Sequence, residues 1–167
     1  MNRRRGRADR RIVLGALLTL VSFTDSARAG DFASDTVKIV SAARQLQSPA
    51  QAVATLGDPV AVHGTASPQL TFNAFRFGID NRNVGAEVTL SYLPPVHAPR
   101  RLDVIAIYYV PVPAESLVRQ WLGPPKKIDD KGIRGRTFVY DGADRAGIGV
   151  WFVAWDGRHV IIFARGQ

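Results

Sequence analysis

The chain has 167 residues and no cysteine, and its 22 Lys and Arg residues against 14 Asp and Glu residues give a formal net charge of +8. The missing thiols exclude a disulfide-stapled miniprotein, a cysteine-ligated metal site and a thiol enzyme. With 46% hydrophobic and 22% charged residues, the composition is typical of a globular protein, and the basic excess taken alone is typical of a nucleic-acid binder.

Residues 1–29 carry most of that basic excess and have the pattern of a secretory signal peptide. Six arginines precede an apolar run from Ile12 to Val21, which is shorter than the roughly 20 residues that a membrane-spanning helix needs. Ala27 and Ala29 are the small residues that a signal peptidase accepts ahead of Gly30. We therefore expect cleavage after Ala29 and a mature protein that is periplasmic or secreted.

Removal of this segment changes what the charge implies. It takes away seven arginines and two aspartates, so the net charge falls from +8 to +3 and nucleic acid is not an expected partner. The pair Arg10-Arg11 also fits a twin-arginine signal, which leaves the Sec and twin-arginine export routes open. No cysteine follows the apolar run, which excludes a bacterial lipoprotein anchor.

The mature chain begins with a lead-in, residues 30–47. Apolar residues near helical spacing predict a helix over residues 35–47, although residues 36–40 are also compatible with a strand. The first unit, residues 48–110, then opens with a capping box that Ser48 forms with Gln51. The short helix that follows is expected to end at a Gly-Asp-Pro sequence, and we predict strands over residues 70–77, 86–92 and 102–109.

The second unit, residues 111–167, has the same order of elements. Pro113 and Glu115 begin a helix whose apolar stripe consists of Leu117, Val118, Trp121 and Leu122. Strands are predicted over residues 137–140, 149–155 and 158–164.

An internal repeat at an offset of 66 residues supports this division. The positions that coincide are Leu56-Gly57 with Leu122-Gly123, Pro59 with Pro125, and Thr71-Phe72 with Thr137-Phe138. We therefore predict an α+β fold of two tandem helix-plus-three-strand units, with an antiparallel sheet and the helices on one face.

The alternation of side chains predicts a binding surface on the second unit. The strand over residues 86–92 alternates apolar and polar residues, as expected when one face meets helices and the other meets water. Alignment of Val84-Gly85 with Ala146-Gly147 places Val150, Phe152 and Ala154 toward the core, and Trp151, Val153 and Trp155 on the helix-free face. Large exposed apolar side chains usually indicate a partner.

A hairpin at Asp156-Gly157 places either Arg158 or, with a longer turn, His159 beside Trp155. The predicted partner-binding residues are therefore Trp151, Val153, Trp155 and Arg158. The other interpretation is that this face packs internally or against a second copy of the chain in a homo-oligomer.

Five cations follow the second helix and form a possible anion-binding cluster: Lys126, Lys127, Lys131, Arg134 and Arg136. The plain interpretation of the same residues is a solvated hairpin with Asp129 and Asp130. Three histidines, His63, His97 and His159, lie far apart in the sequence, and no recognisable catalytic or cofactor motif is present. We therefore expect neither a metal, nor a cofactor, nor an enzymatic activity.

The order helix, Leu-Gly-x-Pro and three-stranded antiparallel meander, occurring twice, resembles two groups of proteins. These are the SmpA/OmlA (BamE-like) outer-membrane-assembly lipoproteins and the β-lactamase-inhibitory-protein-like fold, and the matching residues are Leu56-Gly57-Asp58-Pro59 and Leu122-Gly123-Pro124-Pro125. The resemblance implies a non-catalytic module that binds an envelope or secreted protein through sheet-face aromatics. The alternative is a small-molecule or lipid carrier with a cleft between sheet and helices near Tyr92, Tyr108 and Tyr109.

Overall fold

The computed structural model describes residues 32–79, 85–94, 101–110, 112–132, 134–156 and 159–167. The predicted signal peptide and Arg158 lie outside the described residues. None of the helices in the described part is long and apolar enough to cross a membrane.

Within the described residues, three α-helices form at or near the predicted segments. The N-terminal helix covers residues 32–43 and ends before the predicted residue 47, and residues 36–40 are helical and not a strand. Helix α2 (Pro49–Leu56) begins with the predicted capping box, in which the Gln51 amide donates to Ser48 Oγ at 3.2 Å and the Ser48 amide donates to Gln51 Oε1 at 3.1 Å. Helix α3 (Glu115–Leu122) buries Val118 and Leu122 of its predicted stripe.

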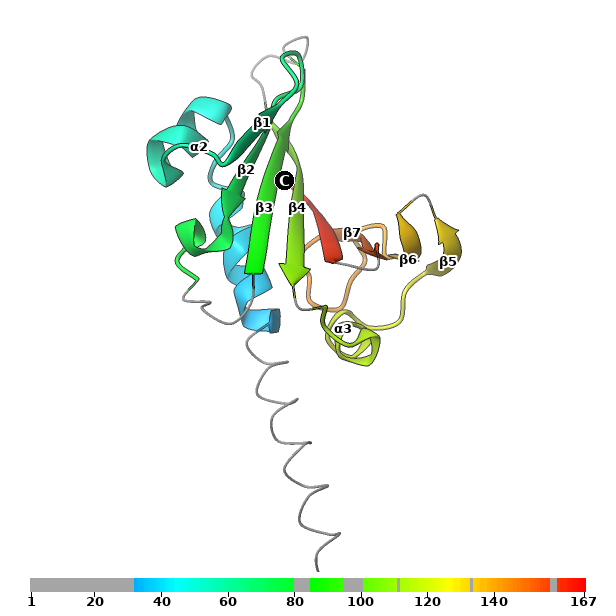
Figure 1. The fold of residues 1–167 in the computed structure, drawn as a ribbon. Helices are drawn as coiled ribbons and strands as arrows, with labels where there is room; N and C mark the ends of the chain where they lie inside the picture. Colours follow the sequence, from blue (N-terminus) through cyan, green and yellow to red (C-terminus); the bar gives the residue numbers. More distant parts are fainter. Residues whose placement is uncertain (1–31, 80–84, 95–100, 111, 133, 157–158) are drawn as a thin grey trace, which may run out of the picture.

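Eight strands form one antiparallel sheet (Figure 1). Their bounds are β1 Ala61–His63, β2 Gln69–Asn73, β3 Gly85–Tyr92, β4 Leu102–Val110, β5 Lys127–Gly132, β6 Gly135–Val139, β7 Val150–Trp155 and β8 Val160–Arg165. A short 3-10 helix, η1 (Ala74–Phe77), follows β2. The spatial order β1-β2-β3-β4-β8-β7-β6-β5 brings the last strand of each half together at the centre of the sheet.

The prediction of two tandem helix-plus-three-strand units is wrong in the number of strands. Each half has four strands, because short edge strands β1 and β5 precede those that the sequence predicted. Strand β1 has three residues, and the sequence Lys-Ile-Asp-Asp-Lys-Gly of β5 carries four charges. Short and charged strands are typical of sheet edges, and they lack the apolar alternation by which strands are recognised.

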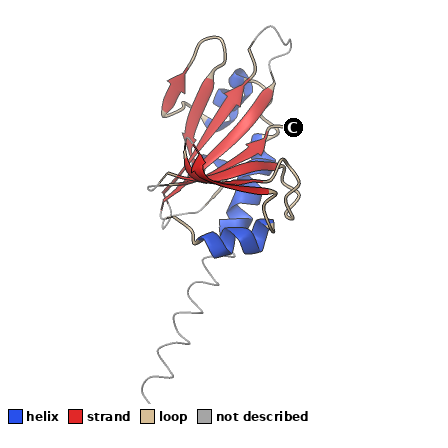
Figure 2. Cartoon of the chain, turned by 90° about the vertical axis from the view of Figure 1, so that its right-hand side faces the viewer, coloured by secondary structure: helices blue, strands red, loops and turns tan. Residues whose placement is uncertain are grey.

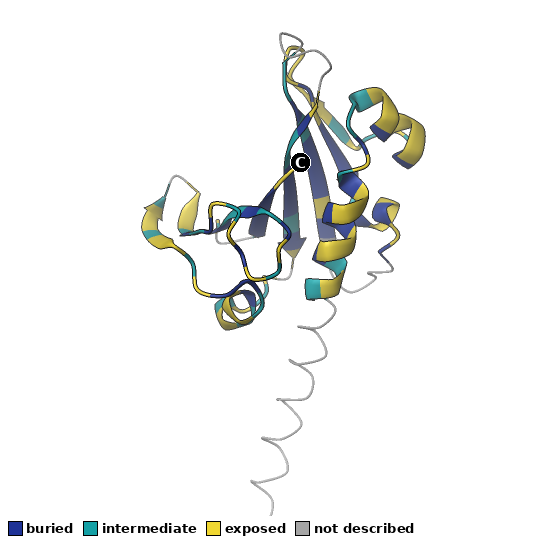
Figure 3. Ribbon diagram, turned by 180° about the vertical axis from the view of Figure 1, so that it is seen from behind, coloured by how far each residue is buried: buried dark blue, intermediate teal, exposed yellow. Residues whose placement is uncertain are grey.

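All three α-helices lie on one side of the sheet (Figure 2). Seen from that side, the N-terminal helix stands in front of buried strands, with its own exposed residues turned away from them (Figure 3). One cluster of buried side chains extends from Ile39 in this helix through Ile105 in β4 to Val118 in α3 and Ile162 in β8. The two halves therefore share a single core.

Three buried tyrosines fix loops and helices to the sheet. Tyr109 is hydrogen-bonded to the Thr36 hydroxyl of the N-terminal helix, Tyr92 donates to the Leu46 carbonyl at 3.0 Å, and Tyr140 donates to the Gly123 carbonyl at 3.3 Å. Burial raises the pKa of Tyr92 and of Tyr109 well above the usual value, and that of Tyr140 to about 12.

These tyrosines predict a loss of stability at high pH. In the unfolded chain their hydroxyls ionise near pH 10, whereas in the folded protein they stay neutral to higher pH, so the free energy of unfolding decreases as the pH rises from about 10 to about 12. Each tyrosine contributes up to about 1.4 kcal/mol per pH unit in this range. Urea denaturation between pH 8 and pH 11.5 measures the slope, and Tyr140→Phe should reduce it; an unchanged slope would contradict the assignment.

Candidate binding surface

The face of the sheet opposite the helices, which we call the open face, carries no helix among the described residues (Figures 1 and 2). The strand register aligns its side chains in rows across the sheet. One row consists of His63, Gln69, Ser91, Val104 and Arg165. The next consists of Ala61, Thr71, Thr89, Ala106, Phe163, Phe152 and Val139, and the third of Asn73, Glu87, Tyr108, Ile161, Ala154 and Thr137.

The open face changes from polar to apolar across these rows. The half formed by β1, β2 and β3 carries hydroxyl, amide, imidazole and carboxylate groups, among them the buried pair Thr71 and Thr89, whose hydroxyl oxygens are 2.9 Å apart. The half formed by β4, β8 and β7 carries an apolar cluster that we call the aromatic patch. Its members are Val104, Ala106, Tyr108, Trp151, Phe152, Ala154, Ile161 and Phe163.

A β-bulge at the start of β7 decides which of its residues reach the open face. Val150 pairs with Ala164 and Phe152 pairs with Phe163, so Trp151 is the additional residue of the bulge. Trp151 and Phe152 both line the depression on the open face, together with Phe163. After the bulge, the alternating residues of β7 lie on the opposite faces of the sheet from those that the alignment with the first unit predicted.

The prediction that Val153 and Trp155 lie on the helix-free face is therefore wrong. Val153 pairs with Phe138 and Ile162 and is fully buried in the core beneath the helices. Trp155 packs against the same core, with its ring centroid 4.7 Å from that of Phe138. Trp151 is the one predicted residue that the structure places on the open face, and Phe152, predicted to face the core, lies beside it.

The hairpin between β7 and β8 differs from both predicted forms. Trp155 pairs with Val160, where the predicted hairpins placed Arg158 or His159 beside it; Arg158 itself lies outside the described residues. His159 Nδ1 lies 3.2 Å from Asp156 Oδ2, and the His159 ring contacts Tyr108 edge-to-face, with ring centroids 6.1 Å apart. His159 thus lies at the Tyr108 end of the aromatic patch.

Buried Asp144 supports the bulge from the preceding loop. Its two carboxylate oxygens accept hydrogen bonds from the Ile148 amide at 3.2 Å and the Val150 amide at 2.8 Å. The second of these amides belongs to the residue directly before Trp151. The carboxylate therefore holds the backbone in the position from which the bulge turns Trp151 to the open face.

Part of the aromatic patch lines a shallow depression of about 470 Å³. Phe152 and Phe163 stack in it with their ring centroids 4.2 Å apart, and Val104 and Trp151 form further apolar walls. Gln69, Ser91 and Asp103 line its polar side. An adjoining depression of about 400 Å³ lies over the polar half and is lined by His63, Gln69, Thr71, Glu87, Thr89 and Tyr108, among others.

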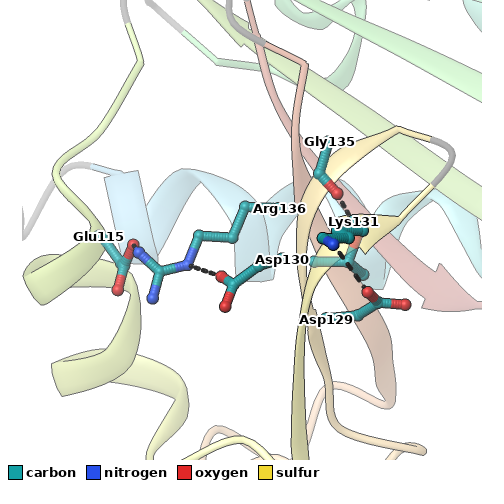
Figure 4. A network of polar contacts seen from close by, with 7 residues as sticks. Glu115, Asp129, Asp130, Lys131, Gly135 and Arg136 are labelled. Atoms are coloured by element: carbon teal, nitrogen blue, oxygen red, sulfur yellow. Dashed lines mark hydrogen bonds and ion pairs between the residues drawn. The ribbon is translucent and has the colours of Figure 1, made fainter.

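The five predicted anion-binding residues belong to the β5–β6 hairpin and the residue before it, and they do not converge on one point. Lys126 forms an ion pair with Asp141 at 2.7 Å. Arg136 binds Glu115 at 2.7 Å and Asp130 at 2.9 Å, which fastens the hairpin to α3 (Figure 4). The Lys131 backbone amide donates to Asp129 Oδ1 in the same hairpin, at 3.0 Å (Figure 4). Lys127 is exposed on the edge strand.

Arg134 differs from these because its guanidinium carbon lies 5.3 Å from the ring centroid of Phe163 on the open face. The next residue, Gly135, has a φ of +83° and lies against the Trp155 backbone, where a Cβ would stand 2.0 Å from the carbonyl oxygen. Arg165 was not among the residues predicted from the sequence. Its guanidinium carbon likewise lies over an aromatic ring, 4.7 Å from the ring centroid of Trp151.

The alternative site between sheet and helices does not form as expected. Tyr92 and Tyr109 are buried on the helix side, where their hydroxyls bind the chain around the N-terminal helix, whereas Tyr108 lies on the open face. The three residues therefore do not line a common cleft.

Within the described residues, no group of three or more His, Asp or Glu side chains is arranged to hold a metal ion. Comparison of the chain with protein-family models, curated proteins and solved structures gave no significant match.

The two faces of the second half can be distinguished by a pair of isosteric substitutions. Val153→Thr places a hydroxyl in the core and should lower the free energy of unfolding by about 1–3 kcal/mol. Val139→Thr, on the half-buried open-face side of the neighbouring strand, should change it by less than about 0.5 kcal/mol. Urea denaturation of the two variants measures both values, and equal effects would contradict the phase assigned to β7.

Proposed function

We propose that this chain is an exported, non-catalytic protein-binding module of the bacterial envelope and that it binds its partner through the open face. The observation that supports this most directly is the aromatic patch on a sheet face without a helix. Trp151, Phe152 and Tyr108 are only half-buried there. Tryptophan and tyrosine are the side chains that most often anchor protein interfaces.

The residues beside the patch also favour a protein surface as the ligand. Its polar neighbours Gln69, Ser91 and Glu87 offer an amide, a hydroxyl and a carboxylate along the adjoining rows. An apolar centre with a polar margin is the usual arrangement of a protein interface. Both depressions are shallow parts of one continuous face, which favours a partner surface over an enclosed small molecule or lipid.

Export rests on the sequence of residues 1–29, and the non-catalytic character rests on the missing catalytic motifs and on the resemblance to the BamE-like and β-lactamase-inhibitory-protein-like groups. The observed order is a helix and four antiparallel strands in each half, whereas the resemblance rests on a helix and three strands. Two such halves share a single wide sheet face, on which one partner would contact strands of both.

The double variant Trp151→Ala/Phe152→Ala tests the proposal. It removes two half-buried rings from the patch, so it should abolish capture of the partner from an envelope extract while leaving the circular dichroism spectrum unchanged. Phe75→Ala is the matched control, because Phe75 is 60% exposed on η1 outside the patch.

The captured protein should also protect β4, β7 and β8 from amide hydrogen exchange. Capture that survives the double variant, or that Phe75→Ala removes equally, would refute the open face as the binding surface.

A further inference from the structure

Two arginines on the open face each lie over an aromatic ring of the aromatic patch. The guanidinium carbons of Arg165 and Arg134 lie 4.7 Å and 5.3 Å from the ring centroids of Trp151 and Phe163. Among the described residues, neither guanidinium has a carboxylate within ion-pair distance. The neighbouring cations Lys126 and Arg136, in contrast, each bind a carboxylate at 2.7 Å.

Stacking leaves the hydrogen-bonding edge of an arginine available. A guanidinium that lies over a ring uses its flat face, whereas its N–H groups point outward in the plane of the group. A carboxylate can accept two of these N–H groups in parallel, in a short and strong charge-assisted pair. Because the ring already restricts the side chain, less conformational entropy is lost when such a pair forms.

The carboxylates near Arg165 do not occupy this edge. Asp141 is bound by Lys126, which lowers the pKa of that carboxyl, and Arg165 contributes only a smaller part of the lowering. Asp103 lines the depression from β4, and among the described residues it forms no ion pair with Arg165, whose guanidinium carbon lies over the Trp151 ring on β7.

From this arrangement we infer the chemistry of the partner segment, on the basis of the proposed function that the open face is the docking surface. The segment carries an Asp or Glu next to a large apolar side chain. The apolar side chain packs on Trp151, Phe152 and Phe163, and the carboxylate binds the N–H edge of Arg165 or Arg134.

Three short peptides with the same apolar residues test the inference. The acidic probe is Ac-Gly-Leu-Asp-Phe-Glu-Gly-NH2, its neutral twin has Asn and Gln in place of Asp and Glu, and its basic twin has Lys at both positions. Binding to the purified protein is followed by the NMR signal of the Trp151 indole N–H, assigned with Trp151→Phe. The acidic peptide should bind about tenfold more tightly than its neutral twin, and added salt should reduce the difference.

Charge-removing variants show whether the two arginines cause that preference. Arg165→Gln/Arg134→Gln should abolish the difference between the acidic and the neutral peptide, and Arg165→Gln alone should reduce it. Arg119→Gln is the matched control, because Arg119 also lies over an aromatic ring, 5.8 Å from the centroid of Phe138, but on α3 at the helix-covered side. This control should keep the full preference.

The possible failures can be told apart. Equal binding of the acidic and neutral peptides, each shifting the Trp151 signal, would overturn the acidic specificity and leave the open face as the docking surface. Tighter binding of the basic twin, or no shift of the Trp151 signal by the acidic peptide, would also overturn the inference. The proposed function itself is decided by the capture experiment, which does not depend on these peptides.

Discussion

The pairing of β4 with β8 is the contact on which the rest of the structure depends. Six residue pairs, from Val104 with Arg165 to Tyr109 with Val160, join the two four-stranded halves into one sheet. A sheet has only two faces, and the helices of both halves lie on the same one, so their apolar residues form one core. The opposite faces of β4 and β8 are thereby left side by side without a helix, and their apolar residues form the centre of the aromatic patch.

The patch is partly covered by its own side chains. Ile161 and Ala154 lie on the open face and are nevertheless only 1% and 0% exposed. The larger rings of Tyr108, Phe152 and Phe163 surround these residues, and the guanidinium of Arg134 lies over one of the rings. Only the outer parts of the rings therefore meet water, which limits the apolar area that the free protein exposes.

Local signals in the sequence were sufficient to predict helices α2 and α3, but not to predict which side of the sheet the β7 side chains occupy. Ser48 and Gln51 specify where α2 begins, and the apolar stripe of α3 specifies its buried side, because both signals depend on neighbouring residues. Residues 150–155 are all apolar, so their alternation does not indicate which side is buried. A single bulge residue, Trp151, then reverses which of the following β7 residues face the helices. The bulge is held by a hydrogen bond from the Val150 amide to the Asp144 carboxylate, and this bond exists only in the folded loop.

The sequence also does not show which of the cations are paired with carboxylates in the folded chain. The sequence grouped Arg134 with Lys126 and Arg136 because they are close along the chain. In the structure Lys126 and Arg136 are neutralised by carboxylates, whereas Arg134 is joined on the open face by Arg165 from the far end of the chain. A count of charges cannot separate a paired cation from one whose hydrogen-bonding edge is available, because that difference depends on which carboxylates the folded chain brings within reach. The chemistry available for a partner therefore depends on where the sheet places each cation, and much less on the net charge.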